Sequence, residues 1–147
     1  SASYGLRTAL ECMAFMGIKT LAQGARVIDL SGRSEVGLII DPLHLDRAGD
    51  SPANIAMLPP ERIAWVQLCD AGVRPDVTDI EALIDEARGN RLVPGTGTLP
   101  LSAVMAAVPD HVPVSLEVPT RGMIGSMPDA EIASTMRDAA VKLLLDH

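Results

Sequence analysis

The sequence predicts an α/β fold, a parallel half-barrel of about four β/α units forming one domain over residues 1–147. Short apolar runs alternate with segments of helical periodicity, an order that is typical of a parallel sheet. Hydrophobic residues make up 48% of the chain, which suits strands covered on both faces. A complete (β/α)₈ barrel needs about 200–250 residues, so 147 residues suffice for only half of one.

The first two units are expected within residues 5–58. A strand at residues 5–13 precedes a helix at 18–30, where apolar residues recur at helical spacing and Gly32 follows the end. A second strand at 36–40 leads into an expected loop, DPLHLDRAGDSP. A short helix at 52–58 follows, because Ser51 and Pro52 form a good N-cap and first-turn pair.

The other two units are expected within residues 63–145. A strand at 63–68, a polar loop and a helix at 79–88 form the third unit. The Gly/Pro-rich segment RLVPGTGT and a helix at 101–108 then separate it from a strand at 114–118 and a last helix at 129–145. A half-barrel of this kind has two free sheet edges, which favour association. We therefore expect a missing N-terminal half-barrel or a second copy of the chain as partner.

Four apolar runs each end in an oxygen-bearing side chain: Glu11, Asp41, Gln67 and Glu117. Parallel strands with connecting helices gather their C-terminal ends on one side of a sheet, so these four side chains are expected to meet. Three carboxylates there repel one another unless a cation lies among them. The set therefore predicts a divalent metal site. Hard oxygen ligands favour Mg²⁺ or Mn²⁺, with Co²⁺ or Zn²⁺ as alternatives.

Three further side chains are candidates for the same site. His44 follows Asp41 by three residues and is a candidate acid/base or substrate-binding group, or else a surface or capping histidine. Arg47 and Arg121 are candidates for binding a substrate anion, or else solvated side chains. His111 precedes a strand, at the end opposite the site, and is expected at the surface.

Composition excludes several classes of function. The net charge of −7, with 12 Lys and Arg, argues against a nucleic-acid partner. No apolar run approaches the roughly 18–20 residues of a membrane span, and the first residues lack the layout of a signal peptide, so a cytoplasmic protein is expected. Cys12 and Cys69 are expected as buried free thiols.

The segments VGLIIDPLHLDRAGDSPANIAMLPPERIAWVQLCDA, RLVPGTGTLPL and VPVSLEVP resemble the sugar phosphate isomerase/epimerase superfamily, the xylose isomerase-like TIM barrels. The resemblance spans nearly the whole chain but only the C-terminal half of that barrel, strands five to eight. It implies that Glu11, Asp41, Gln67 and Glu117 are the metal ligands and that His44 is a substrate-binding or acid/base residue. Glutamine at position 67 is similar to the 3-dehydroshikimate dehydratase branch, whereas Thr96 replaces an acid common in relatives.

The expected activity follows from this site. A divalent metal would stabilise the enediolate or enolate of a polyhydroxy carbonyl substrate, such as a sugar, a sugar phosphate or a dehydroshikimate-like compound. The reaction is expected to be isomerisation, epimerisation or dehydration, with Glu11, His44 and Glu117 as catalytic residues. The alternative is a catalytically silent half-barrel, a fragment or subunit that acts by assembly.

Overall fold

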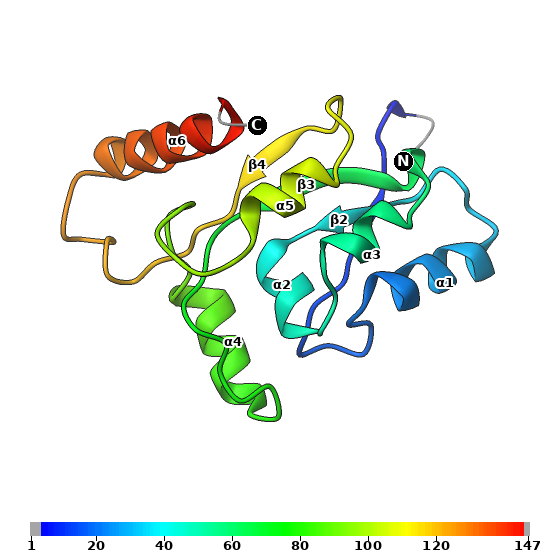
Figure 1. Ribbon diagram of the computed structural model, residues 1–147, viewed down its shortest axis with the longest axis horizontal. Helices are drawn as coiled ribbons and strands as arrows, with labels where there is room; N and C mark the ends of the chain where they lie inside the picture. The colour runs from blue at the N-terminus through cyan, green and yellow to red at the C-terminus, as the bar shows by residue number, and fades with distance from the viewer. Residues whose placement is uncertain (1–3, 146–147) are drawn as a thin grey trace.

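A computed structural model describes residues 4–145 and contains a four-stranded parallel sheet in the order β1-β2-β3-β4. The strands are β1 (Ala9–Glu11), β2 (Gly37–Ile40), β3 (Ile63–Leu68) and β4 (Val114–Leu116), and the chain crosses over through helical segments between them (Figure 1). The predicted α/β fold with four parallel strands is therefore confirmed. β1 and β4 each pair on one side only, so the described sheet has the two free edges that a half-barrel requires.

Six α-helices and one 3₁₀ turn accompany the sheet within residues 4–145. They are α1 (Leu21–Ser31), α2 (Pro42–Arg47), α3 (Pro52–Ala56), the 3₁₀ turn Pro60–Arg62, α4 (Ile80–Gly89), α5 (Leu101–Ala106) and α6 (Asp129–Leu145). The five helices expected from periodicity are all present. The expectation of a loop directly after Asp41 was wrong, because Asp41 caps α2 and Pro42 occupies its first turn. Six residues are too few for apolar periodicity to reveal such a helix.

The first strand is shorter than the sequence suggested. Residues 5–13 read as an apolar run, but only Ala9–Glu11 pairs with β2. The backbone N–H of Gly37 still donates to the carbonyl of Thr8, which extends the contact by one residue. α1 begins at Leu21, three residues later than expected, because Thr20 and Gln23 form a capping box there. Its end agrees with the prediction, since Gly32 closes the helix in the left-handed region at φ 66°.

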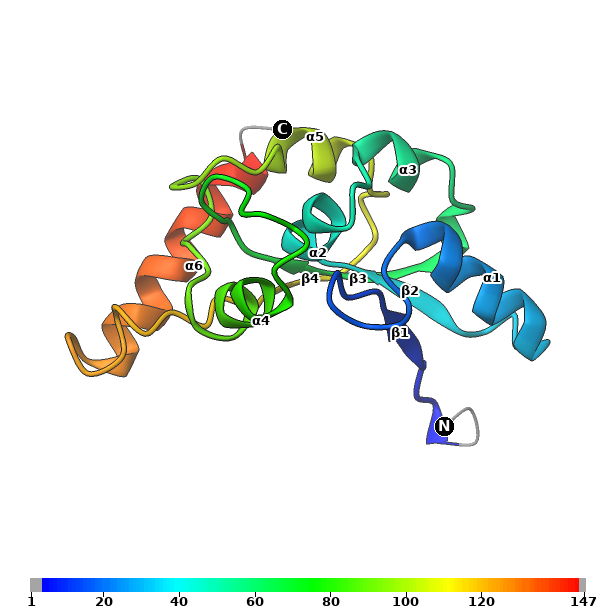
Figure 2. The ribbon, with the colours of Figure 1, turned by 90° about the horizontal axis from the view of Figure 1, so that it is seen from below.

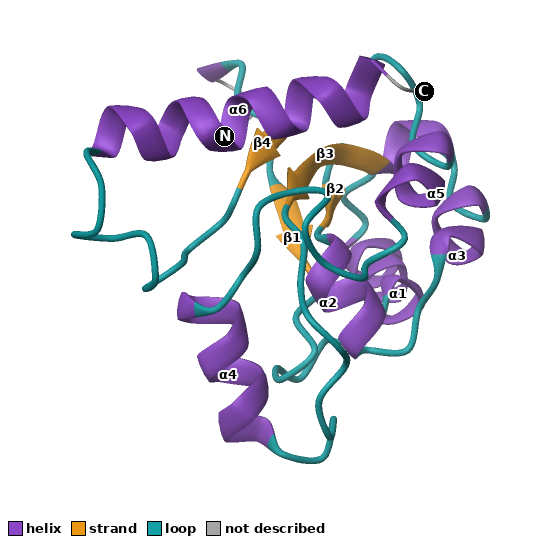
Figure 3. Ribbon diagram, turned by 60° about the vertical axis from the view of Figure 1, so that its left-hand side comes forward, coloured by secondary structure: helices purple, strands orange, loops and turns teal. Residues whose placement is uncertain are grey.

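The hydrophobic core lies between the sheet and the helices α1, α3 and α5, which line one face of it (Figures 1 and 2). Leu38 and Ile40 of β2 and Val66 and Leu68 of β3 are fully buried and alternate along their strands. Figure 3 shows α6 beside β4, at one edge of the sheet, and its Ala140 is buried in the same core. Along the described part of the chain, no helix combines the length and the apolar character that crossing a membrane requires.

The opposite face of the sheet carries the predicted ligands. Glu11 pairs in register with Ile39, Ile39 with Trp65, and Gln67 with Ser115. Side chains at paired positions of parallel strands share a face, and so do residues two apart on one strand. Glu11 and Gln67 therefore project from the same face. This face is less covered than the other, since Trp65 is half-buried and Ser115 is exposed.

Candidate metal centre

The site begins where β2 turns into α2. The Asp41 side chain accepts hydrogen bonds from the backbone N–H of Leu43 (2.9 Å) and His44 (3.3 Å), which makes it the N-cap of α2. The cap turns the chain sharply, so that His44 lies over the end of the strand rather than beyond it. His44 is 3% exposed, and its ring meets Phe15 edge-on at a centroid distance of 5.3 Å.

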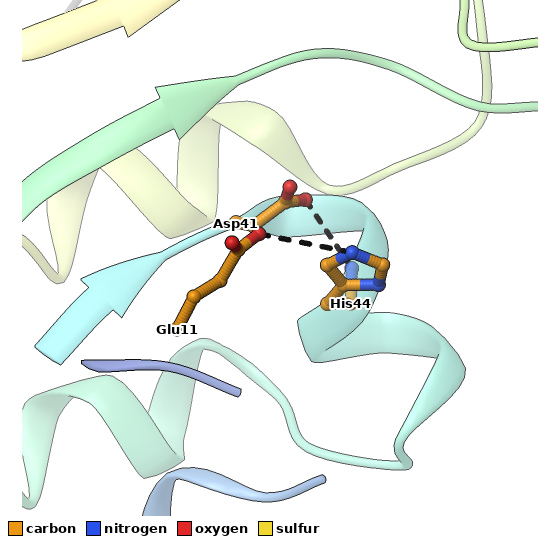
Figure 4. Close-up of side chains that lie close together, drawn as sticks. All are labelled: Glu11, Asp41 and His44. Carbon is orange, nitrogen blue, oxygen red and sulfur yellow. Dashed lines mark hydrogen bonds and ion pairs between the residues drawn. The ribbon is translucent and has the colours of Figure 1, made fainter. Parts of the chain in front are cut away.

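Glu11, Asp41 and His44 form a compact group with candidate ligand atoms within 4.8 Å of one another. His44 Nε2 lies 3.8 Å from Glu11 Oε1. Figure 4 shows the two carboxylates side by side, one from β1 and one from the end of β2, with the imidazole ring reaching them from α2. Three side chains that lie 30 and three residues apart in sequence thus converge, and their donor set suits a divalent cation.

Gln67 and Glu117 complete the predicted set from β3 and from the end of β4. Gln67 Oε1 and Glu117 Oε2 are both buried and have no hydrogen-bond partner among the described residues. A buried oxygen that lacks a partner is costly unless something else satisfies it. A cation would satisfy both orphaned oxygens, so the oxygen donors present fit a metal. Among the described His, Cys, Asp and Glu side chains, the group whose ligand atoms lie within 4.8 Å of one another consists of Glu11, Asp41 and His44, so Gln67 and Glu117 as further ligands stay a prediction.

Arg91 is a member of the site that the sequence did not single out. Its Nη1 lies 2.6 Å from Asp41 Oδ2, and its Nη2 lies 3.8 Å from Glu117 Oε1. Nη1 also donates to Cys69 Sγ at 3.3 Å. The only sequence signal was the position of Arg91 at the start of the Gly/Pro-rich segment RLVPGTGT. Pairing with a residue 50 positions away leaves no local pattern.

Burial and charge set the protonation of the site. Burial raises the pKa of Glu11 from 4.5 to about 7, and the Asp41 and Glu117 carboxylates add to the rise, whereas Arg91 opposes it. Burial lowers the pKa of His44, so its imidazole is neutral at pH 7 and able to accept a proton. Burial also raises the pKa of Cys69 to about 12, which keeps the thiol protonated rather than a thiolate ligand.

The Glu11 pKa predicts a pH dependence of stability. The unfolded carboxyl loses its proton near pH 4.5 and the folded one near pH 7, so the folded state binds more protons in that window. The free energy of unfolding of the metal-free protein should therefore fall between pH 5 and pH 8, by on the order of 2 kcal/mol from this group. The measurement is urea unfolding of the parent and of Glu11→Gln at both values of pH. Equal pH dependence in the two proteins would contradict the assignment.

Arg47 and Arg121 are engaged elsewhere in the fold. Arg47 Nε and Nη2 form a bidentate pair with Glu86 (2.9 and 2.7 Å), and Nη1 binds Asp46 at 2.6 Å. Arg121 is exposed and pairs with Asp85 of α4 at 2.6 Å. Both interactions belong to the scaffold around α4, so substrate binding by either arginine stays a prediction. His111 is exposed, and Cys12 and Cys69 are free and buried, as expected.

The RLVPGTGT segment is fixed by a buried carboxylate. Asp70 accepts hydrogen bonds from the backbone N–H groups of Ala71 and Leu99 through Oδ1, and from those of Gly95 and Gly97 through Oδ2. Two backbone hydrogen bonds join Asp70 to Leu92, the residue after Arg91. Asp70 thus anchors the segment that delivers Arg91 to the site. Thr96 is exposed and bonds only locally, through Oγ1 to the carbonyl of Val93.

At Gly97, the RLVPGTGT segment lies too close to Asp70 and Ala71 to leave room for a side chain. A Cβ there would lie 2.2 Å from the carbonyl oxygen of Ala71 and 2.4 Å from Asp70 Oδ1. Gly97→Ala is expected to lower the free energy of unfolding by about 1–3 kcal/mol, since the segment must shift. Gly122→Ala is the matched control, because a Cβ there meets nothing within 4 Å. Equal urea midpoints for the two variants would refute the close contact.

The fold and the site together define an α/β half-barrel with an oxygen-rich centre at the C-terminal ends of its strands. Comparison with known families agrees, since residues 1–142 match the family described as xylose isomerase-like TIM barrel. The chain belongs to this family. The resemblance stated from the sequence is thereby confirmed.

The chain corresponds to about half the length of the barrel structures that it resembles. The IOLI protein, whose structure contains a zinc atom, superposes with a TM-score of 0.82 at 20% identity over 96% of this chain and 50% of its own. A xylose isomerase domain protein from Alicyclobacillus acidocaldarius gives 0.73 at 25% identity over 97% and 52%. A 3-dehydroshikimate dehydratase from Pseudomonas aeruginosa is 31% identical over 118 residues, 78% of this chain but 18% of the relative.

Proposed function

We propose that this chain supplies the metal-binding half of a barrel enzyme that removes a proton next to the carbonyl group of a small polyhydroxy compound. One observation carries the proposal. Gln67 Oε1 and Glu117 Oε2 are buried without partners at strand ends of the same sheet as the Glu11, Asp41 and His44 group. A site that is rich in carboxylates and holds unsatisfied oxygens is suited to a divalent cation.

The bound cation would supply Lewis-acid stabilisation of the negative oxygen that develops on the substrate. The residues of the chain have separate tasks. Glu11, Asp41, Gln67 and Glu117 would hold the cation, and the N–H groups of α2 fix the Asp41 carboxylate in place. His44 is neutral at pH 7 and buried beside Glu11, so Nε2 is the group we assign to accept the substrate proton.

The direction of the reaction depends on what happens after proton removal. In a dehydration, hydroxide leaves from the carbon beyond the enolate and takes up a proton as water. In an epimerisation, a second group must return a proton to the opposite face, and Glu11 and Glu117 are the candidates. The 31% identity to a 3-dehydroshikimate dehydratase supports dehydration of a similar substrate as the specific form of the proposal. Gln67 supports the same branch.

The chain spans about half the length of the barrels it matches. We infer that a second half-barrel, from the same polypeptide or from a second copy of the chain, covers the free edges of β1 and β4 and completes the pocket. Sedimentation gives the test: a well-folded sample with the mass of these 147 residues alone would contradict this part of the proposal.

The activity is tested on the protein in its assembled form, after treatment with EDTA and reloading with Mn²⁺, Mg²⁺, Co²⁺ or Zn²⁺. With 3-dehydroshikimate as substrate, loss of water followed by enolisation gives an aromatic ring, whose ultraviolet absorbance should rise only in the loaded protein. In D₂O, polyhydroxy ketones should exchange the proton next to the carbonyl. No turnover, no exchange and no metal-dependent thermal shift would favour the catalytically silent half-barrel.

A further inference from the structure

The Arg91 guanidinium lies among the atoms that are proposed to hold the metal. It follows α4, and its Nε donates to the carbonyl of Ala87 at 2.9 Å, which directs the rest of the group inward. There it meets Asp41 Oδ2, Glu117 Oε1 and the carbonyl oxygen of Glu117. The Arg91 side chain is 2% exposed and that of Asp41 is 1% exposed, so this ion pair has almost no contact with water.

We propose that Arg91 is the internal counter-cation of the metal-free site and that metal binding must displace its guanidinium from Asp41. The inference rests on the proposed metal site. It adds a role for a residue that is not itself a ligand. Arg91 would hold Asp41 and Glu117 in place while the site is empty, and it would compete with the metal for the same carboxylate oxygen.

The hydrogen bonds of Asp41 explain why the two cations exclude each other at this oxygen. Oδ1 already accepts from the N–H groups of Leu43 and His44, which cap α2 and cannot leave without unwinding it. Oδ2 is therefore the oxygen available for a metal, and Arg91 Nη1 occupies it at 2.6 Å. A guanidinium stays charged at every accessible pH, so protonation cannot remove this competitor.

The surroundings of Arg91 allow the side chain to move without the backbone. The N–H of Arg91 donates to the carbonyl of Pro119, and the next residue, Leu92, is bonded to Asp70 in both directions. These bonds hold the main chain on either side of the Arg91 Cα. The displaced guanidinium would still have Glu117 as an ion-pair partner, because Nη2 already lies 3.8 Å from its carboxylate. Displacement of the guanidinium thus breaks its contact with Asp41, keeps its contact with Glu117 and leaves the fold intact.

The experiment measures Mn²⁺ affinity in the assembled protein, with Mn²⁺ alone as the probe. Arg91→Ala and Arg91→Gln are compared with the parent by calorimetry at constant pH and ionic strength. Both variants should bind Mn²⁺ about 10-fold more tightly or better, because a charge-assisted hydrogen bond no longer competes. Arg137→Ala is the matched control for loss of a positive charge, since Arg137 is exposed on α6 and pairs with its neighbour Asp138. Its affinity should equal that of the parent.

A second experiment distinguishes competition between guanidinium and Mn²⁺ from a general change in the shape of the site. Guanidinium ion at millimolar concentration should enter the space left in Arg91→Ala and weaken Mn²⁺ binding in proportion to its concentration, whereas NaCl of equal ionic strength should not. Parent and Arg137→Ala should not respond. Unchanged or weaker Mn²⁺ binding in both Arg91 variants would overturn the inference while leaving the metal site standing. Absence of Mn²⁺ binding in the parent and in every variant would overturn both.

Discussion

Asp41→Ala is expected to lower the free energy of unfolding of the metal-free protein by about 3–5 kcal/mol. The substitution removes the carboxylate that lies 2.6 Å from the buried Arg91 guanidinium and leaves it only the longer ion pair with Glu117 at 3.8 Å, so poor compensation of a buried charge is the main cost. It also removes the cap of α2, which alone contributes about 1 kcal/mol. Urea unfolding in the presence of EDTA measures the loss.

Asp85→Ala is the matched control for Asp41→Ala. Asp85 forms an ion pair with Arg121 at the same distance, 2.6 Å, but both side chains are more than half exposed. Water replaces the lost partner there, so the expected loss is about 0–1 kcal/mol. If the two substitutions had equal effects, the buried pair between Arg91 and Asp41 would not be present in solution.

His44→Asn is expected to reduce turnover by about 10²–10⁴-fold in the assembled, metal-loaded protein. Asparagine retains a polar side chain of similar size but cannot accept the proton at Nε2. Substrate binding should change much less, so the loss should appear in kcat rather than in KM. The measurement is steady-state kinetics with the substrate that passes the activity test.

The metal affinity of His44→Asn decides between two roles for the histidine. His44 lies within the same 4.8 Å group as Glu11 and Asp41, a position that also suits a ligand. A proton-accepting role requires that the Mn²⁺ dissociation constant stay close to that of the parent. If Mn²⁺ affinity fell by the same factor as turnover, His44 would be a ligand and the assigned base would be wrong.

Much of the fold could be predicted because its signals are local. β3 (Ile63–Leu68) and α6 (Asp129–Leu145) have the bounds expected from apolar runs and helical periodicity. Glu11, Asp41 and Gln67 could be selected as candidates because each follows an apolar run, and the C-terminal ends of parallel strands lie together whatever their separation in sequence. α2 could not be predicted, because a helix of six residues depends on its cap more than on its own composition.

The sequence by itself determined the parallel half-barrel, its family and the candidate ligands, because periodicity, strand ends and motifs can each be recognised within a short stretch of consecutive residues. Only the tertiary structure decided which arginine places its guanidinium beside those ligands in the metal-free chain. Arg47 and Arg121, singled out in the sequence, pair with Glu86 and Asp85, whereas Arg91 reaches Asp41 across 50 residues. The three arginines have identical side chains, so only the packing of the folded chain determines which of them reaches Asp41.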